Sequence, residues 1–394
     1  MHRRRLLLFI LPVVILGLVI AHGIGGQSEN PVAQVWLPID QSGIRMVPNI
    51  DQGPHHTAHA AILYERSTNT VLFGHNIHQR RAPASLTKIM TAIVAVENGV
   101  LNDIVTVSAN AAATRGSSAN LYAGQQIRLI DLLYGLLLNS GNDAAVAIAE
   151  HIAGSVEAFA EMMNERAREM GLQNTQFRNP HGLDEPGHYS TAFDLALLTD
   201  AAMNYPQIAE IIATKEYQWN ETLYWRNTNR LLWQMQGAEG VKTGTTGQAG
   251  NCLIAAVSDD GMQLVSVVLG SSDRWADSER ILNYGFSQFH RLTLVEKGEV
   301  VAEVPLPTGM GPLIAVARSP LAVVVPSDEP LDIEFRTVLD NVRPPVRRGE
   351  KVGHLEVTFK SGDSGFTLHL IAGHDIARRT PARVLWEWLS NLWA

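Results

Sequence analysis

The chain has 394 residues, of which 46% are hydrophobic and 18% charged, so it is long enough for two globular domains with sizeable cores. Its formal net charge of −8 at pH 7 gives no reason to expect nucleic acid as a partner. The single cysteine, Cys252, excludes an intramolecular disulfide framework, and no metal-ligand spacing such as His-Glu-x-x-His occurs.

Residues 1–23 have the pattern of an export segment. A basic start, Arg3-Arg4-Arg5, precedes an apolar stretch that is shorter than the roughly 20 residues a membrane span needs. A cleaved signal peptide is therefore favoured over a retained anchor. Both alternatives place the remainder of the chain outside the cytoplasmic membrane. Residues 24–59 are polar with scattered prolines and are predicted to form a linker.

A hairpin is predicted over residues 60–73, and it leads into Ser85-Leu86-Thr87-Lys88 at the start of an apolar helix. Residues three apart on a helix are neighbours, so this spacing puts a hydroxyl beside an amine. A desolvated lysine can take the proton of a serine nucleophile, and a helix start favours developing negative charge. The alternative is a helix-capping serine followed by a solvated lysine. The apolar residues around most of the helix circumference argue against a solvated lysine.

A second polar element, Ser140-Gly141-Asn142, lies between two apolar helical stretches. Ser-x-Asn occurs four times in the chain, so the tripeptide alone is uninformative. Its position between two buried helices would hold Ser140 and Asn142 in fixed places, as a functional site requires. A further helix is predicted from Glu157 to Met170.

The third element is Lys242-Thr243-Gly244, followed by Thr245 and by strands at 251–257 and 262–269. A cationic side chain on an edge strand can hold a carboxylate while the strand backbone pairs with an extended peptide. A glycine-rich hairpin with a surface lysine is the alternative. Strands at both ends of a helical middle predict an α+β domain, an antiparallel sheet flanked by helices and carrying a helical insertion.

The amino-acid composition changes in the C-terminal part of the chain, from about residue 292. Short valine-rich stretches separated by Gly, Pro and Asp predict a small all-β domain over residues 292–375. Residues 378–394 have apolar residues at helical spacing, three tryptophans and adjacent arginines. Such an amphipathic helix suits a bilayer interface, and docking on the β-rich domain is the alternative.

Together, Ser85-x-x-Lys88, Ser140-Gly141-Asn142 and Lys242-Thr243-Gly244 resemble the signature of penicillin-binding proteins and β-lactamases. Flanking segments narrow the resemblance to the D-alanyl-D-alanine carboxypeptidase family, over about residues 61–286. These segments are 83–92, 132–145, 177–184, 189–192 and 227–232. Two departures stand out: Thr245 occupies a position where some members have histidine, and no glutamate lies in a convincing context for a deacylation base.

The resemblance implies a penicillin-binding protein fold over residues 60–291 and an exported enzyme on the outer face of the cytoplasmic membrane, attached through its C-terminal helix. The substrate would be a peptidoglycan stem peptide ending in D-Ala-D-Ala, and β-lactams would acylate the same serine. Neither a metal nor an organic cofactor is implied. The alternatives are a D,D-endopeptidase or weak β-lactamase on the same scaffold, and a non-catalytic penicillin-binding sensor.

The resemblance also implies a role for each residue of the signature. Ser85 is the nucleophile and Lys88 its base, and the Ser85 and Thr245 amides face the oxyanion. Ser140 relays a proton to the leaving group, and Asn142 orients Lys88. The substrate carboxylate is held by Lys242 and Thr243, with Gly244 leaving room for the ligand. Arg274 is a further carboxylate ligand or, alternatively, a partner in a salt bridge.

Overall fold

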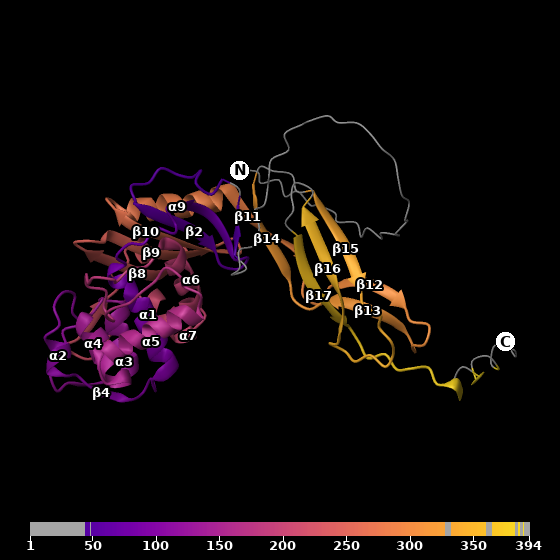
Figure 1. The fold of residues 1–394 in the computed structure, drawn as a ribbon, viewed down its shortest axis with the longest axis horizontal. Helices are drawn as coiled ribbons and strands as arrows, with labels where there is room; N and C mark the ends of the chain where they lie inside the picture. The colour runs from indigo at the N-terminus through magenta and orange to yellow at the C-terminus, as the bar shows by residue number, and fades with distance from the viewer. Residues whose placement is uncertain are drawn as a thin grey trace, which may run out of the picture. The chain divides into compact units, whose positions relative to one another are not determined.

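The computed structural model describes residues 44–47, 49–327, 332–359, 365–382, 385, 386 and 389. Within these residues, the N-terminal portion is built on a sheet with the strand order β1-β3-β2-β10-β9-β8 (Figure 1). In that order the strands are Arg45–Met46, Thr70–His75, Ala60–Glu65, Met262–Ser271, Gly250–Asp259 and Ala238–Thr246.

The hairpins predicted before and after the helical middle of the chain are confirmed, and they lie side by side in the sheet. β2 pairs antiparallel with β3, and β9 pairs antiparallel with β10. The prediction of a wholly antiparallel sheet is wrong at one edge, because β1 runs parallel to β3. β1 spans only Arg45–Met46, inside the stretch predicted as a linker. Two residues are too few to show a strand periodicity in the sequence.

Both faces of the sheet are covered by helices, as its buried strands require. β2 is buried along its whole length. Because side chains alternate along a strand, its residues divide between two apolar clusters. Ile62 belongs to the cluster that includes the helices α1 and α6, whereas Leu63 belongs to the cluster that includes Ile281 and Leu282 of α9. Figure 1 shows α9 along one side of the sheet and α1, α6 and α7 on the opposite side.

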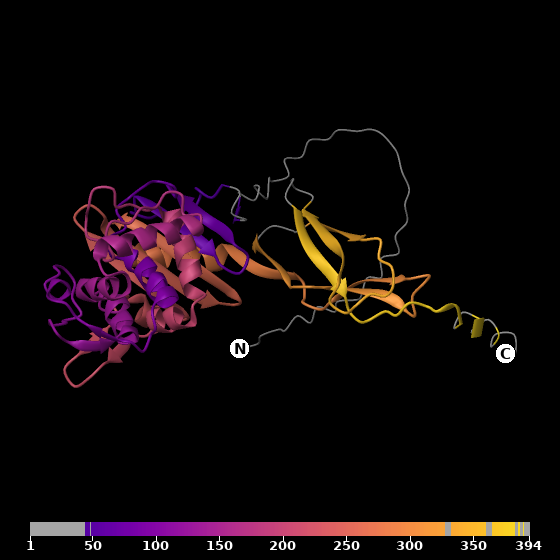
Figure 2. The same cartoon turned by 60° about the horizontal axis from the view of Figure 1, so that its bottom comes forward.

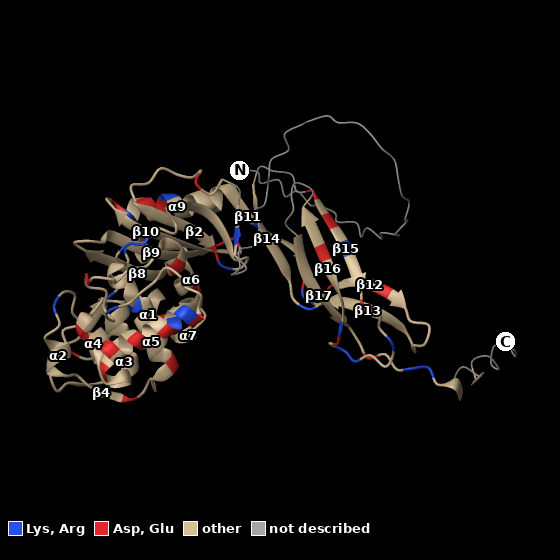
Figure 3. Ribbon diagram, in the orientation of Figure 1, with Lys and Arg blue, Asp and Glu red and all other residues tan. Residues whose placement is uncertain are grey.

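The helical middle of the chain follows the predicted pattern. The helix predicted from Glu157 is α5, Val156–Glu169, which begins after the capping residue Ser155. It buries an apolar stripe and exposes acidic and basic residues together, as Figure 3 shows. The helices are η1 Ala84–Thr87, α1 Lys88–Asn98, α2 Ala109–Ala112, α3 Leu129–Leu137, α4 Asn142–Ala153, α5 Val156–Glu169, α6 Ala192–Met203, α7 Pro206–Ala213, α8 Leu231–Gln234 and α9 Arg274–Gln288.

Short strands complete this portion of the chain. β4 (Ile104–Thr106) pairs with β5 (Gln126–Arg128), and β6 (Glu216–Gln218) pairs with β7 (Tyr224–Arg226). Both pairings are antiparallel, and β7 leads within a few residues into α8 and the edge strand β8.

An all-β arrangement follows α9, as predicted from the valine-rich stretches. One sheet has the order β12-β13-β17-β16-β15, and β11 pairs with β14. These strands carry the orange-to-yellow colours in Figures 1 and 2. They are β11 Phe289–Val295, β12 Val300–Pro305, β13 Pro312–Ala317, β14 Leu321–Pro326, β15 Ile333–Leu339, β16 Lys351–Phe359 and β17 Gly365–Ala372.

Two predicted segments lie mainly outside the described residues. The export segment, residues 1–23, is wholly outside them, and only part of the predicted tail helix is within them. In that tail, Leu385, Trp386 and Leu389 are exposed. None of the helices that the structure describes is long and apolar enough to cross a bilayer.

Candidate active site

Ser85 lies in the short turn η1, directly before α1. Its neighbours Ala84, Leu86 and Thr87 are buried, whereas Ser85 itself is only partly buried. Ala84 has a φ of +50°, a left-handed conformation that a residue with a side chain adopts at some cost. Within this buried turn, Ser85 is therefore the one residue that remains partly accessible.

Lys88, the first residue of α1, is fully buried beneath that hydroxyl. Its Nζ lies 2.9 Å from Oγ of Ser85, 2.7 Å from Oδ1 of Asn142 and 2.7 Å from the carbonyl oxygen of His181. Burial lowers the pKa of Lys88 well below its ordinary value, and the charge of Lys242 lowers it further, against an opposing effect of Asp143. A lysine whose neutral form is favoured by burial is therefore placed against a serine hydroxyl.

Asn142 accepts a hydrogen bond from Lys88 in the first turn of α4. Its Nδ2 donates to the carbonyl oxygen of Arg115 at 2.7 Å, which turns Oδ1 toward the lysine. The next residue, Asp143, accepts hydrogen bonds from the backbone amides of Ala119 and Leu121, at 2.8 and 3.1 Å. The buried Asp143 carboxylate thus ties the start of α4, which carries Asn142, to the loop that contains Ala119 and Leu121.

Ser140 occupies the turn between α3 and α4, as predicted, two residues before Asn142. It is 5% exposed and has a φ of +60°, so a left-handed backbone sets the direction of its side chain.

The edge strand β8 passes beside Ser85. A Cβ atom added to Gly244 would lie 3.0 Å from the amide nitrogen of Ser85 and 3.0 Å from Cβ of Ala84. Glycine permits this approach without displacing those atoms, and it brings the backbone after Gly244 next to Ser85. On its other edge β8 pairs with β9, so the edge toward η1 lacks a strand partner among the described strands. An extended peptide could pair there.

Lys242 and Thr243 are both buried in β8. Burial, helped by the charge of Arg274, lowers the pKa of Lys242 to about 7. Oγ1 of Thr243 shares a 2.7 Å hydrogen bond with Oγ1 of Thr228, which lies just before α8. β8 therefore presents a titratable cation and a fixed hydroxyl close to Ser85.

Arg274 begins α9 after the capping residue Asp273 and reaches back to the sheet. Its Nη1 donates to the carbonyl oxygen of Gly244 and to Oγ1 of Thr245, both at 2.9 Å, and to the carbonyl oxygen of Cys252 at 3.2 Å. It has no ion pair with any residue that the structure describes, so the salt-bridge alternative finds no support. Arg274 thus adds a second cation at the far end of the Lys242–Thr245 segment.

Sequence reasoning missed the loop from Asn179 to Asp184, whose contribution to the site is made largely by its backbone. The His181 carbonyl oxygen accepts from Lys88, and Oδ1 of Asn179 accepts from the Gly182 amide at 2.7 Å. Gly182 has a φ of +87°, and a Cβ there would lie 1.8 Å from the carbonyl oxygen of Ala84. The family-like segment 177–184 marked this loop, but no residue type in it predicts a carbonyl ligand.

The same loop is tied to the turn after β8. The Asp184 carboxylate accepts from Oγ1 of Thr246 at 2.6 Å and from the amide of Gln248 at 3.1 Å. Elements far apart in the sequence are thereby held around one serine. No cluster of His, Cys, Asp and Glu suited to a metal ion occurs within the described ranges.

Comparison with known families and structures gives a consistent result. Residues 48–273 match the family model described as D-alanyl-D-alanine carboxypeptidase, and residues 289–378 match the C-terminal domain of penicillin-binding protein 5. The D-alanyl-D-alanine carboxypeptidase DacF of Bacillus subtilis is 38% identical over 78% of this chain and 83% of its own length. DacC of Escherichia coli is 35% identical over 77% of this chain and 81% of its own length.

Among solved structures, penicillin binding protein 5 from Haemophilus influenzae superposes with a TM-score of 0.71 at 31% identity, covering 82% of this chain and 98% of that one. The match to the family model spans more than half of the chain and includes every residue described above at the site except Arg274. The chain therefore belongs to the D-alanyl-D-alanine carboxypeptidase family, the low-molecular-mass serine penicillin-binding proteins.

Proposed function

We propose that this protein is a serine-type carboxypeptidase that removes the terminal D-alanine from peptidoglycan stem peptides through an acyl-enzyme on Ser85. The observation that carries the proposal is the set of contacts around Nζ of Lys88. Asn142 Oδ1 and the His181 carbonyl oxygen can only accept hydrogen bonds, so they take two N–H groups of a neutral amine. Oγ of Ser85 lies 2.9 Å from Nζ and accepts its third contact in this structure. When the amine is neutral, its lone pair points along that contact and can take the Ser85 proton.

Acylation follows from this arrangement. Oγ of Ser85 attacks the carbonyl carbon of the penultimate D-alanine while its proton passes to Nζ of Lys88. The amides of Ser85 and Thr245 stabilise the oxyanion, consistent with the close approach of β8 to Ser85. The C–N bond to the last D-alanine then breaks, and Ser140 relays a proton to the leaving amine. Water hydrolyses the ester and returns the shortened peptide and the free serine.

The substrate carboxylate is assigned to the β8 end of the site. Lys242, Thr243 and Thr245 line it, and Arg274 adds a guanidinium that is already bonded to Thr245. Pairing of the peptide backbone with the open edge of β8 would extend the substrate past Ser85. A β-lactam, whose ring amide and carboxylate imitate the same peptide end, should acylate Ser85 in the same way.

The pH dependence of acylation tests the role of Lys88. Because only the neutral amine accepts a proton, the rate of penicillin acylation should rise with pH through the lowered pKa of Lys88 and level off well below 10.5, the ordinary value. Lys242 is charged below its own pKa of about 7 and contributes to that lowering. In Lys242→Gln, the acidic limb of the profile should therefore move to higher pH. An unchanged limb, measured by stopped-flow acylation, would contradict the assignment of the base.

Two other functions fit the sequence signature less well. A D,D-endopeptidase or weak β-lactamase would share this scaffold, but the matched relatives are named carboxypeptidases. A non-catalytic penicillin sensor would also need Lys88 for its own acylation, but the matched relatives are named carboxypeptidases. Product analysis separates these possibilities, because only the carboxypeptidase releases free D-alanine from an uncrosslinked pentapeptide.

For the organisation of the whole chain, we propose an export signal in residues 1–23 and a linker in 24–59, whose part from Arg45 onward joins the sheet through β1. We further propose the carboxypeptidase domain in 60–291, a β-rich domain in 292–375 and a membrane-associating helix in 378–394. The enzyme would then act on the outer face of the cytoplasmic membrane. Exposure of Leu385, Trp386 and Leu389 supports an interfacial helix, since such residues favour the boundary between water and lipid.

Deletion of residues 383–394 tests this attachment. The signal-processed chain lacking them should move from the membrane to the soluble fraction, with turnover of a soluble D-Ala-D-Ala peptide unchanged, because the apolar helix is lost and the site is not. Sedimentation with vesicles of anionic lipid, with and without the deletion, measures the change. Retention of the shortened chain on the vesicles would assign membrane attachment to another segment.

A further inference from the structure

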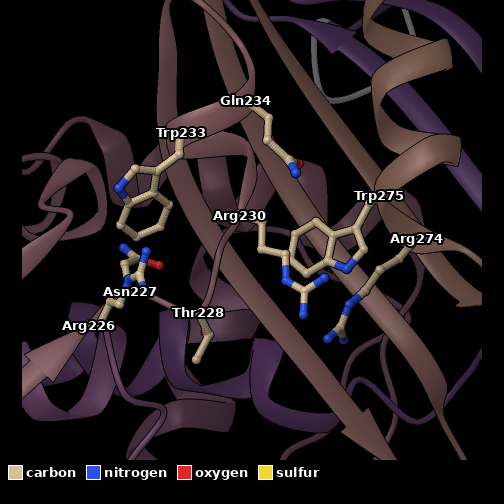
Figure 4. Close-up of a pocket in the computed structure, with 8 residues that line it drawn as sticks. All are labelled: Arg226, Asn227, Thr228, Arg230, Trp233, Gln234, Arg274 and Trp275. Atoms are coloured by element: carbon tan, nitrogen blue, oxygen red, sulfur yellow. The ribbon is translucent and has the colours of Figure 1, made fainter.

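A cavity of about 560 Å³ lies beside the carboxylate end of the site, between the β7–α8 connection and the start of α9 (Figure 4). Apart from Arg274, its side chains have no role in the reaction described above. We call it the arginine pocket. Its walls include Arg226, Arg230, Arg274, Trp233, Trp275 and Gln234.

The arginine pocket is positively charged and has aromatic walls. Three guanidinium groups line it, and no carboxylate is among its lining residues. Cζ of Arg230 lies 5.7 Å and Cζ of Arg274 5.0 Å from the centre of the Trp275 ring, and Figure 4 shows the two groups beside that indole. Cζ of Arg226 lies 4.8 Å from the centre of the Trp233 ring. The three guanidinium groups that line the pocket therefore each contact a tryptophan ring, Arg226 that of Trp233 and Arg230 and Arg274 that of Trp275.

These charges are incompletely neutralised. Arg226 has an exposed ion pair with Glu216 at 3.6 Å, whereas Arg230 has no ion pair with any residue in the described part of the chain. The pKa of Arg274 is lowered chiefly by burial and also by Arg230, an effect of two like charges near each other. An anion bound in the pocket would remove this repulsion and form charge-assisted hydrogen bonds.

The arginine pocket adjoins the site through shared residues. Thr228 lines the pocket and bonds to Thr243 of β8. Arg274 lines the pocket and bonds to the Gly244 carbonyl oxygen and to Thr245. If the terminal carboxylate of a peptide binds at Thr243 and Thr245, the side chain of its C-terminal residue therefore lies beside the arginine pocket.

We propose that the arginine pocket binds an anionic side chain on the leaving residue, so that the enzyme also releases a C-terminal D-residue carrying a second carboxylate. The guanidinium of Arg230 pairs with that carboxylate, and the indole of Trp275 covers the methylenes that carry it. This inference rests on the proposed carboxypeptidase function.

The test uses the full-length enzyme and three acylated peptides that end in D-Ala-D-Ala, D-Ala-D-Glu and D-Ala-D-Gln. D-Glu and D-Gln match in size and differ in charge, so the ratio of their kcat/KM values isolates the charge. The wild-type ratio should favour D-Glu by about tenfold, as expected of one charge-assisted hydrogen bond in a partly open site. In Arg230→Gln the ratio should fall to about one, and Arg230→Lys should recover part of it.

Arg168→Gln provides the matched control, because it removes an exposed arginine that lies on α5. It should leave the D-Glu to D-Gln ratio at the wild-type value. Equal use of D-Glu and D-Gln by the wild type, or equal loss of the ratio in Arg168→Gln and Arg230→Gln, would overturn the inference while D-Ala release continues. Absence of release from all three peptides would instead overturn the proposed function, and the inference with it.

Discussion

Replacing Ser85 by alanine is expected to lower the turnover of D-alanine release by about a thousandfold or more. The change removes the only atom that can form the acyl-enzyme, while Lys88, Asn142 and the oxyanion amides remain in place. The substitution deletes one partly exposed oxygen from a turn that is otherwise packed, so the fold should persist. D-Alanine release from a pentapeptide, measured with an enzyme-coupled assay, gives the answer.

Ser272→Ala is the matched control, because Ser272 is exposed and its hydrogen bond to the side chain of Thr57 is made by its backbone amide, which the substitution keeps. It should release D-alanine at the wild-type rate. A folded Ser85→Ala protein, judged by its thermal transition, that still released D-alanine at a comparable rate would refute the nucleophile assignment.

Replacing Lys88 by methionine is expected to slow penicillin acylation by about a hundredfold to ten-thousandfold, the range for loss of a positioned general base. Methionine fills most of the volume of the buried lysine but has no lone pair able to take the Ser85 proton. It also leaves the acceptors on Asn142 and His181 without their donor, so some loss of stability should accompany the loss of rate.

The two effects can be separated. Acylation is measured at a temperature well below the thermal transition of the variant, so that the folded fraction is the same as in the wild type. Lys215→Met, at an exposed position, controls for the loss of a lysine as such. Wild-type acylation rates in Lys88→Met would show that another group removes the Ser85 proton.

The parts of the site that lie on regular elements could be predicted from the sequence. Apolar residues around most of α1 indicated that Lys88 is buried, and burial is the main cause of its lowered pKa. The apolar stretches on both sides of Ser140 likewise placed Asn142 at the start of a buried helix. In both cases the apolar residues of the helix are packed in the core, so the polar residue beside them is held in a fixed position.

The rest depends on backbone atoms and on tertiary contacts. The His181 carbonyl oxygen contacts Lys88 because Gly182 and Asn179 shape the loop, and carbonyl groups carry no signature of residue type. The parallel partner of β3 is only Arg45–Met46, which is too short for a periodic pattern. The arginine pocket joins the chain before α8 to the start of α9, and sequence spacing alone does not bring those segments together.

We expect a single pocket to activate Ser85 toward a D-Ala-D-Ala carbonyl. The most direct test of this expectation is peptide mapping by mass spectrometry after brief exposure of the full-length enzyme to benzylpenicillin. The peptide that contains Ser85 should gain the mass of one penicilloyl group, and this adduct should be lost when D-Ala-D-Ala peptide is present in excess. An adduct on a different serine, or none on an enzyme that still releases D-alanine, would contradict the expectation.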